Sequence, residues 1–147
     1  MEIIEIYSKG EYPANVLSNF APNGFELDGV KCASMEGFLQ SLKFRSVKRQ
    51  LYVCSLVGKA AKELGSKKFL WKLTGRVHWQ GKRYARDGEE FDALIKRAYA
   101  ALYNNEEFRT ALESTRGKEL RHSMGKHKKR ATILTEEEFI SNLTHFV

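Results

Sequence analysis

The chain has few cysteines and prolines and no long hydrophobic segment. Its two cysteines, Cys32 and Cys54, are too few for a disulfide framework and lack the paired spacing and histidine companions of a zinc site. We expect both to be small buried hydrophobic residues. No apolar run approaches the roughly 20 residues that cross a membrane, and the N-terminal segment carries acidic side chains where a secretory signal carries lysine or arginine. These absences predict a cytoplasmic protein with no membrane partner and no bound metal.

The chain also lacks repeats and linkers, but it is rich in basic side chains. Its 147 residues, 42% of them hydrophobic, suffice for one core, and we expect a single domain over 1–147. The formal net charge of +7 favours polyanionic partners such as nucleic acid, nucleotides or phosphorylated metabolites. Basic clusters at 67–68, 76–86 and 127–130 fit such a partner, but they equally fit a solvated surface. Charge alone therefore identifies no single polyanion.

The start of the chain predicts short strands separated by a loop. Residues 2–7 are rich in isoleucine and alternate weakly, as a strand does. Residues 8–24 contain Gly, Pro, Asn and Ser and predict a long irregular loop. Within 25–32, the pair Asp28-Gly29 supplies the two positive φ angles of a type I′ turn and predicts a tight hairpin.

From Ser34 onward the spacing of hydrophobic residues becomes helical. Ser34 is the expected N-cap of a helix that runs to about Arg45. Shorter helices are expected within 46–54, over 57–64 before the glycine that follows, and over 105–113.

Residues 66–86 hold both tryptophans and many basic side chains, and they predict a loop with a short hairpin. Asp87 with Glu90 forms a capping-box pattern that predicts the start of a long helix. Thr135 with Glu138 forms the same pattern and predicts a last helix that runs to the end of the chain. The expected fold class is mainly α: an α+β fold with one small β-hairpin sheet.

Three polar side chains share one stripe of the helix that begins at Ser34. Glu36, Gln40 and Lys43 are spaced i, i+4 and i+7, which at about 100° per residue places them together beside the hydrophobic face. They fit either an ordinary surface ion pair bridged by Gln40, or a carboxylate and an amine at the edge of a pocket. The second interpretation needs a wall from another segment. The loop at 18–20 offers a hydroxyl, an amide and an aromatic ring suited to sugar and base contacts.

Six segments of the chain resemble those of a known family. The loop, hairpin and helix read LSNFAPNGFELDGVKCASMEGFLQSLKF, which resembles the opening signature of the NADAR (YbiA-like) family. Five more resemble a phage and bacterial branch of that family: AAKELG at 60–65, Trp79-x-Gly81 with Arg86, the long helix ending in AYAAL, the segment 105–112, and LRHSMGK followed by TILTEEEF. Together they cover nearly the whole chain in order.

The resemblance implies a small, mainly helical YbiA-like domain that binds ADP-ribose-like ligands and cleaves N-glycosidic bonds. No cofactor is expected. Carried over by motif position, Glu36 is the expected catalytic carboxylate and Lys43 the expected catalytic amine. The other expected ligand-binding residues, at the sugar or the pyrophosphate, are Ser18, Asn19, Phe20, Gln40, Trp79, Arg86, His122, Ser123 and Lys126.

The chemistry of such a cleavage suits these residue types. Breaking an N-glycosidic bond places positive charge on the sugar, and a carboxylate can stabilise that charge or move a proton. A lysine can attack the anomeric carbon and form an imine with the opened sugar. The amine needs a lowered pKa for this role, by desolvation or by a second cation.

The resemblance allows more than one substrate. The branch that acts on riboflavin-pathway intermediates carries a Trp-Gly-Asp-Gly segment near its C-terminus, where this chain reads HSMGKHKKR. The basic segment favours a larger polyanion, so the expected reaction is hydrolysis of the bond between ADP-ribose and a nucleobase, with ADP-ribosylated guanine in DNA as the favoured substrate. A cognate ADP-ribosyltransferase toxin is the expected functional counterpart.

Three alternatives stay open at this point. The first is an N-glycosidase on small riboflavin-pathway or NAD-derived metabolites. The second, from another class, is a non-catalytic ADP-ribose or nucleic-acid binding module. The third, a plain DNA-binding helical domain, rests on the charge alone.

Overall fold

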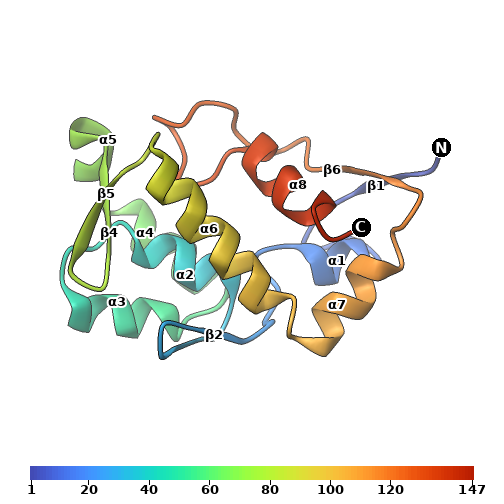
Figure 1. Ribbon diagram of the computed structural model, residues 1–147, viewed down its shortest axis with the longest axis horizontal. Coiled ribbons are helices and arrows are strands. Elements are labelled where there is room, and N and C mark those ends of the chain that lie inside the picture. The colour runs from blue at the N-terminus through green and yellow to red at the C-terminus, as the bar shows by residue number, and fades with distance from the viewer.

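Eight α-helices and six short β-strands make up the computed structural model, which describes all 147 residues (Figure 1). The helices are α1 (Ala14–Leu17), α2 (Met35–Ser41), α3 (Val47–Cys54), α4 (Gly58–Ser66), α5 (Leu70–Thr74), α6 (Glu89–Leu102), α7 (Glu106–Glu113) and α8 (Glu136–Thr144). The strands are β1 (Ile3–Glu5), β2 (Phe25–Leu27), β3 (Val30–Cys32), β4 (Arg76–Trp79), β5 (Lys82–Ala85) and β6 (Glu119–Arg121). The expected mainly α, α+β class is confirmed.

The strands form three separate pairs rather than the one small sheet expected. The β2–β3 hairpin turns at Asp28 and Gly29, whose φ angles are 51° and 79°, as its Asp-Gly pair predicts. The β4–β5 hairpin turns in the same way at Gln80 and Gly81, with φ angles of 47° and 84°. The third pair joins β1 in parallel to β6, which was not predicted. It places the N-terminal segment beside the segment that follows α7 (Figure 1).

Helix α2 lies at the centre of the molecule, and all seven of its residues are buried. The Ser34 Oγ accepts a hydrogen bond from the Gly37 N–H at 3.0 Å and donates one to the Leu56 carbonyl at 2.9 Å, so the expected N-cap is confirmed. The helix ends at Ser41, earlier than the predicted end near Arg45. The Lys43 N–H then bonds the carbonyl three residues back, at 3.1 Å, in a tight 3₁₀-type turn.

The two predicted capping boxes have different outcomes. The Thr135 and Glu138 box is present at the start of α8, although that helix ends at Thr144 rather than at the last residue. The Asp87 and Glu90 box is wrong. Helix α6 begins one residue later than expected, with Gly88 as its N-cap, and glycine has no side chain that could cap the helix. The Glu90 carboxylate pairs with Lys82 of the neighbouring hairpin. Helices α1 and α5 were also not expected, since both are short and lie in segments predicted as loops.

The hydrophobic core is one cluster of thirty buried residues contributed by nearly every element. At its centre the Phe38 ring packs edge-on against Trp79, with ring centroids 5.0 Å apart. Cys32 and Cys54 are buried free thiols, as expected. None of the helices has the length and hydrophobicity that a membrane crossing requires.

Replacing Gly37 by alanine should destabilise the fold. A Cβ there would lie 2.6 Å from the Leu56 carbonyl oxygen and 3.0 Å from that of Val53, and these backbone atoms cannot swing aside. We expect a loss of about 1–3 kcal/mol, seen as a lower midpoint in thermal unfolding. Gly24→Ala is the matched control, because its nearest contact would be an ordinary 3.5 Å. Equal midpoints for the two variants would contradict the close approach.

Candidate active site

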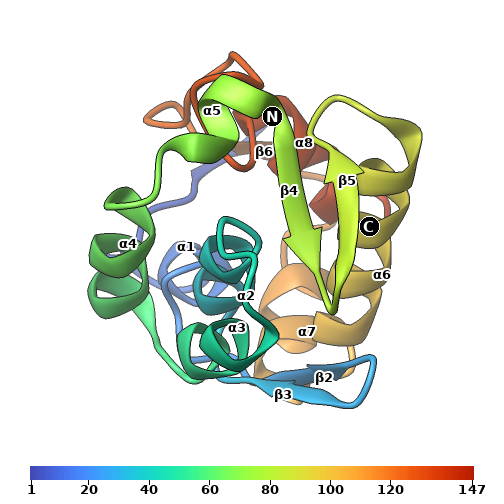
Figure 2. The same cartoon turned by 90° about the vertical axis from the view of Figure 1, so that its left-hand side faces the viewer.

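A cleft of about 420 Å³ opens on one side of α2. Its walls come from the loop 18–20, from α2 and the turn after it, from the α4–α5 segment, and from the segment that runs from His122 to Thr135 before α8. Figure 2 shows α2 beside α4, with the segment that leads into α8 closing the top. Elements distant in sequence therefore meet at this cleft.

The Glu36 carboxylate forms the buried floor of the cleft. The residue is only 9% exposed, and its Oε2 accepts a hydrogen bond from the Gln40 Nε2 at 2.6 Å. Burial raises the pKa of Glu36, while the Gln40 hydrogen bond and the positive charges of Lys43, Lys62 and His122 oppose that rise. A carboxyl group with a raised pKa holds a proton more readily than an ordinary glutamate and is suited to general acid or base chemistry.

Lys43 lies in the turn that follows α2 and lines the same cleft as Glu36. Burial, together with the positive charges of Lys72, Lys126 and Lys62, lowers the pKa of Lys43 to about 8, and Glu36 opposes this shift. At pH 7 about one tenth of the Lys43 side chains are then uncharged, a far larger fraction than for an ordinary lysine. The interaction between the two residues is coulombic rather than a hydrogen bond. Because Glu36 is buried, Glu36 and Lys43 do not form the ordinary surface ion pair that the sequence also allowed.

A hydrogen bond from Tyr99 fixes the orientation of the Asn19 side-chain amide. Its Oδ1 accepts a hydrogen bond from the fully buried Tyr99 hydroxyl at 2.8 Å, which leaves the Nδ2 free to donate. Its backbone carbonyl accepts the Glu36 N–H at 3.0 Å, tying the loop to the first turn of α2. The Ser18 Oγ caps the same loop by accepting the Phe20 N–H at 3.1 Å. All three loop residues line the cleft.

Five lysines line the cleft, against the single carboxylate of Glu36. They come from the turn after α2, from α4, α5 and the segment between them, and from the segment before α8: Lys43, Lys62, Lys68, Lys72 and Lys126. Such an excess of positive charge suits a diphosphate group. Sequence reasoning missed Lys62, Lys68 and Lys72, since only a charge cluster at 67–68 marked this segment. Local spacing carries no signal that these side chains face α2.

The segment around His122 contributes some of its expected residues and not others. His122 and Lys126 line the cleft, and the His122 Nδ1 lies 3.0 Å from the Ile6 carbonyl oxygen, which can only accept a hydrogen bond. Ser123 does not line it, because its N–H and hydroxyl both bond the Glu5 carboxylate, at 2.7 and 2.6 Å. Trp79 is likewise outside the cleft. Its ring lies in the core and its Nε1 donates to Asp28 at 2.8 Å.

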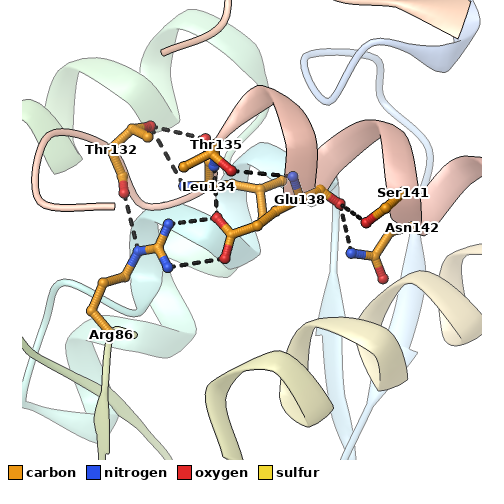
Figure 3. Close-up of polar contacts among 7 residues, drawn as sticks. All are labelled: Arg86, Thr132, Leu134, Thr135, Glu138, Ser141 and Asn142. Carbon is orange, nitrogen blue, oxygen red and sulfur yellow. Dashed lines mark hydrogen bonds and ion pairs between the residues drawn. The ribbon is translucent and has the colours of Figure 1, made fainter. Parts of the chain in front are cut away.

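Arg86 lies behind the cleft wall rather than in the cleft, which corrects its expected position (Figure 3). The residue is 3% exposed, and its guanidinium donates two hydrogen bonds to the Glu138 carboxylate, at 2.6 and 3.1 Å. A third goes to the Thr132 carbonyl, while the Thr135 N–H donates to the same carboxylate. Arg86 thus positions the segment that leads into α8, which forms one wall of the cleft.

The arrangement combines a buried acid, an amine with a lowered pKa and a ring of positive charge. It can bind a phosphorylated ligand, exchange a proton and offer a nitrogen nucleophile at one place. No group of three or more His, Cys, Asp or Glu side chains is placed to hold a metal ion.

The fold of the chain is YbiA-like. The NMR structure of the E. coli protein YbiA matches it with a TM-score of 0.63, covering 99% of this chain and 82% of that chain. The two share 17% sequence identity, so the likeness concerns the fold.

Sequence comparison places the chain in a phage family. Residues 11–146 match the family described as "Bacteriophage protein GP30.3". An uncharacterized 17.1 kDa protein from the Gp30–rIII intergenic region of Enterobacteria phage T4 is 37% identical over 145 residues, which are 97% of this chain and 95% of that protein. The chain belongs to the bacteriophage protein GP30.3 family.

Loss of the Arg86 ion pair should destabilise the protein strongly. Arg86→Met leaves the Glu138 carboxylate, whose side chain is 14% exposed, without its partner, and we expect a loss of about 3–5 kcal/mol in urea unfolding. Arg97→Met removes a half-exposed pair with Asp28 and should cost about 1 kcal/mol or less. If both variants lose the same stability, Arg86 does not hold this wall.

Lys43 should titrate apart from an ordinary lysine. In carbon-13 NMR of the reductively methylated protein, one resonance should have its midpoint near pH 8, whereas unperturbed lysine amines titrate at about 10.4. Lys43→Arg should remove that resonance. In Glu36→Gln the midpoint should fall further, because the lost carboxylate charge raises the pKa of Lys43 in the native protein. A midpoint that stays or rises would contradict the electrostatic coupling of the two residues.

Proposed function

We propose that the protein is an N-glycosidase that hydrolyses the bond between ADP-ribose and a nucleobase. One observation carries the proposal: Glu36, whose pKa is raised, and Lys43, whose pKa is lowered, line one cleft that four further lysines surround. Perturbed titratable groups gathered in a cleft are typical of catalytic sites. The YbiA-like fold and the resemblance to NADAR proteins support the same class of reaction.

Each part of an ADP-ribosyl group has a matching wall. The diphosphate meets the lysines, above all Lys62, Lys68 and Lys126. The free Nδ2 of Asn19 donates to a ribose hydroxyl, because Tyr99 holds the other end of the amide. The Phe20 ring, with the Lys62 Nζ 5.8 Å from its centroid, offers an aromatic face to a base.

The reaction breaks the bond between the anomeric carbon and the base nitrogen. The base leaves with the electron pair and takes up a proton, and Glu36 stabilises the positive charge on the sugar or transfers the proton. Water supplies the new oxygen, either directly or after the Lys43 amine has added to the carbon and formed an imine of the opened sugar. The products are the unmodified base and free ADP-ribose.

ADP-ribosylated guanine in DNA is the substrate we favour. The net charge of +7 and the basic segment 126–130 suit a polyanion larger than a free nucleotide. A cognate ADP-ribosyltransferase toxin would produce such a substrate.

Activity is tested by incubating the protein with an oligonucleotide that carries ADP-ribosyl-guanine and measuring unmodified DNA and free ADP-ribose. Wild type should release ADP-ribose, and Glu36→Gln should lower kcat by about 10²–10⁴-fold, the usual contribution of a general acid or base. Lys43→Ala should abolish any product that forms through an imine. Lys59→Met and Glu63→Gln are the controls, because this exposed pair on α4 lies outside the cleft.

Each outcome identifies a different function. Turnover only of small riboflavin-pathway or NAD-derived glycosides would assign the metabolite N-glycosidase instead. Tight binding of ADP-ribose without turnover of any substrate would make the protein a binding module. Wild-type activity in both Glu36→Gln and Lys43→Ala would contradict the proposed site.

A further inference from the structure

A second hollow, of about 650 Å³, lies next to the cleft and is strongly basic. It is bounded by α5, by the start of β4 and by the segment 128–130, and we call it the basic groove. Figure 2 shows α5 and the segment before α8 together at one end of the molecule. Five exposed cations line the groove: Lys72, Arg76, Lys128, Lys129 and Arg130.

The charges of the basic groove have no carboxylate partners within the protein. None of the five cations takes part in an ion pair, and the Arg76 guanidinium contacts only the carbonyl of its neighbour Gly75, at 3.4 Å. Asp87 is the one acidic residue on the wall, whereas Arg86, also on the wall, is neutralised by Glu138. Five unpaired cations in one concave surface make a site for a polyanion with several separated phosphates.

The basic groove adjoins the cleft. Lys72 lines both, and its Nζ lies 5.9 Å from the centre of the Trp71 ring, which borders the groove. The Lys43 Nζ lies 5.6 Å from the centre of the same ring and belongs to the cleft. Lys72 therefore borders both hollows, and a polymer held in the cleft can extend into the groove beside it.

Exposed hydrophobic side chains lie on α5 and at its N-cap, within a turn of Lys72. Phe69, Leu70 and Leu73 are 65%, 66% and 75% exposed, unusually high for such large apolar residues. An exposed aromatic ring next to a basic groove is the combination that binds single-stranded nucleic acid, where bases stack on rings while cations follow the backbone.

We propose that the basic groove binds the phosphodiester backbone of a single-stranded nucleic acid whose modified nucleotide occupies the cleft. The link to a modified nucleotide rests on the proposed function, whereas backbone binding by the groove can be measured without it. A single strand fits better than a duplex, because the base must leave its stack for the reacting bond to reach Glu36 and Lys43. Phe69 then supplies the stacking surface for a flanking base.

The test uses an unmodified, fluorescein-labelled single strand of about 12 nucleotides, followed by anisotropy at several salt concentrations. The groove variant is the triple substitution Arg76→Ala, Lys128→Ala and Lys129→Ala. Its control removes the same number and kind of exposed cations on β3 and α3, by Lys31→Ala, Lys48→Ala and Arg49→Ala. These lie at the other end of the molecule (Figure 2).

Wild type should bind, and the groove variant should lose roughly tenfold or more in affinity, with the slope of log K against log salt reduced by about 2. The control should retain the wild-type slope to within about half a unit. Phe69→Ala should weaken binding with an unchanged slope, because stacking releases no counterions. Comparison of DNA with RNA of the same sequence names the polymer, and either preference agrees with the proposal.

Several results would overturn the proposal. These are no binding by wild type, equal losses in the groove variant and the control, or tighter binding to a duplex than to the single strand. Equal loss of free ADP-ribose binding in the groove variant would assign these cations to the cleft instead. The oligonucleotide carries no ADP-ribose, so its binding is measured independently of the reaction. Binding without glycosidase activity would therefore reject the proposed reaction but still support nucleic-acid binding by the groove.

Discussion

The burial of the Glu36 carboxylate is the constraint on which the site depends. An anion removed from water is costly unless other groups replace its hydration. Here the Gln40 amide donates to it at 2.6 Å, the first turn of α2 favours negative charge, and Lys43, Lys62 and His122 add positive charge around it. Gln40 is itself fixed, because its Oε1 lies against Gly65, where a Cβ would come within 1.8 Å of it. Because Gly65 has no Cβ, α4 can lie close to α2, and the cleft forms between them and the segment that leads into α8.

The same burial links structure to chemistry. Burial raises the pKa of the Glu36 carboxyl and lowers the pKa of the Lys43 amine, so that the two pKa values move toward one another. Their coupling is mutual, since each charge stabilises the other, while the nearby lysines favour the uncharged amine. Arg86 acts on this arrangement from behind: it holds Thr132 and Glu138, and through them a wall of the cleft (Figure 3).

Features determined by neighbours in sequence could be predicted, whereas features determined by distant partners could not. The Asp28-Gly29 turn, the Ser34 cap and the Thr135 capping box depend on a few adjacent residues, and all three are confirmed.

Lys43 was expected on α2 and instead lies just beyond it, but the tight turn after Ser41 keeps it on the side of Glu36. The Asp87 box is wrong because Gly88, not Asp87, is the N-cap of α6. Arg86 was misplaced because its partner Glu138 lies far along the chain. Lys62 and Lys72 face the cleft through packing that no local spacing records.

A crystal structure of Glu36→Gln with ADP-ribose bound would test the proposed site most directly. We expect the anomeric carbon of the distal ribose to lie between the side chains at 36 and 43, with the diphosphate against the cleft lysines and a ribose hydroxyl on the Asn19 amide. ADP-ribose bound only in the basic groove, or with its anomeric carbon turned away from Lys43, would contradict the proposed site.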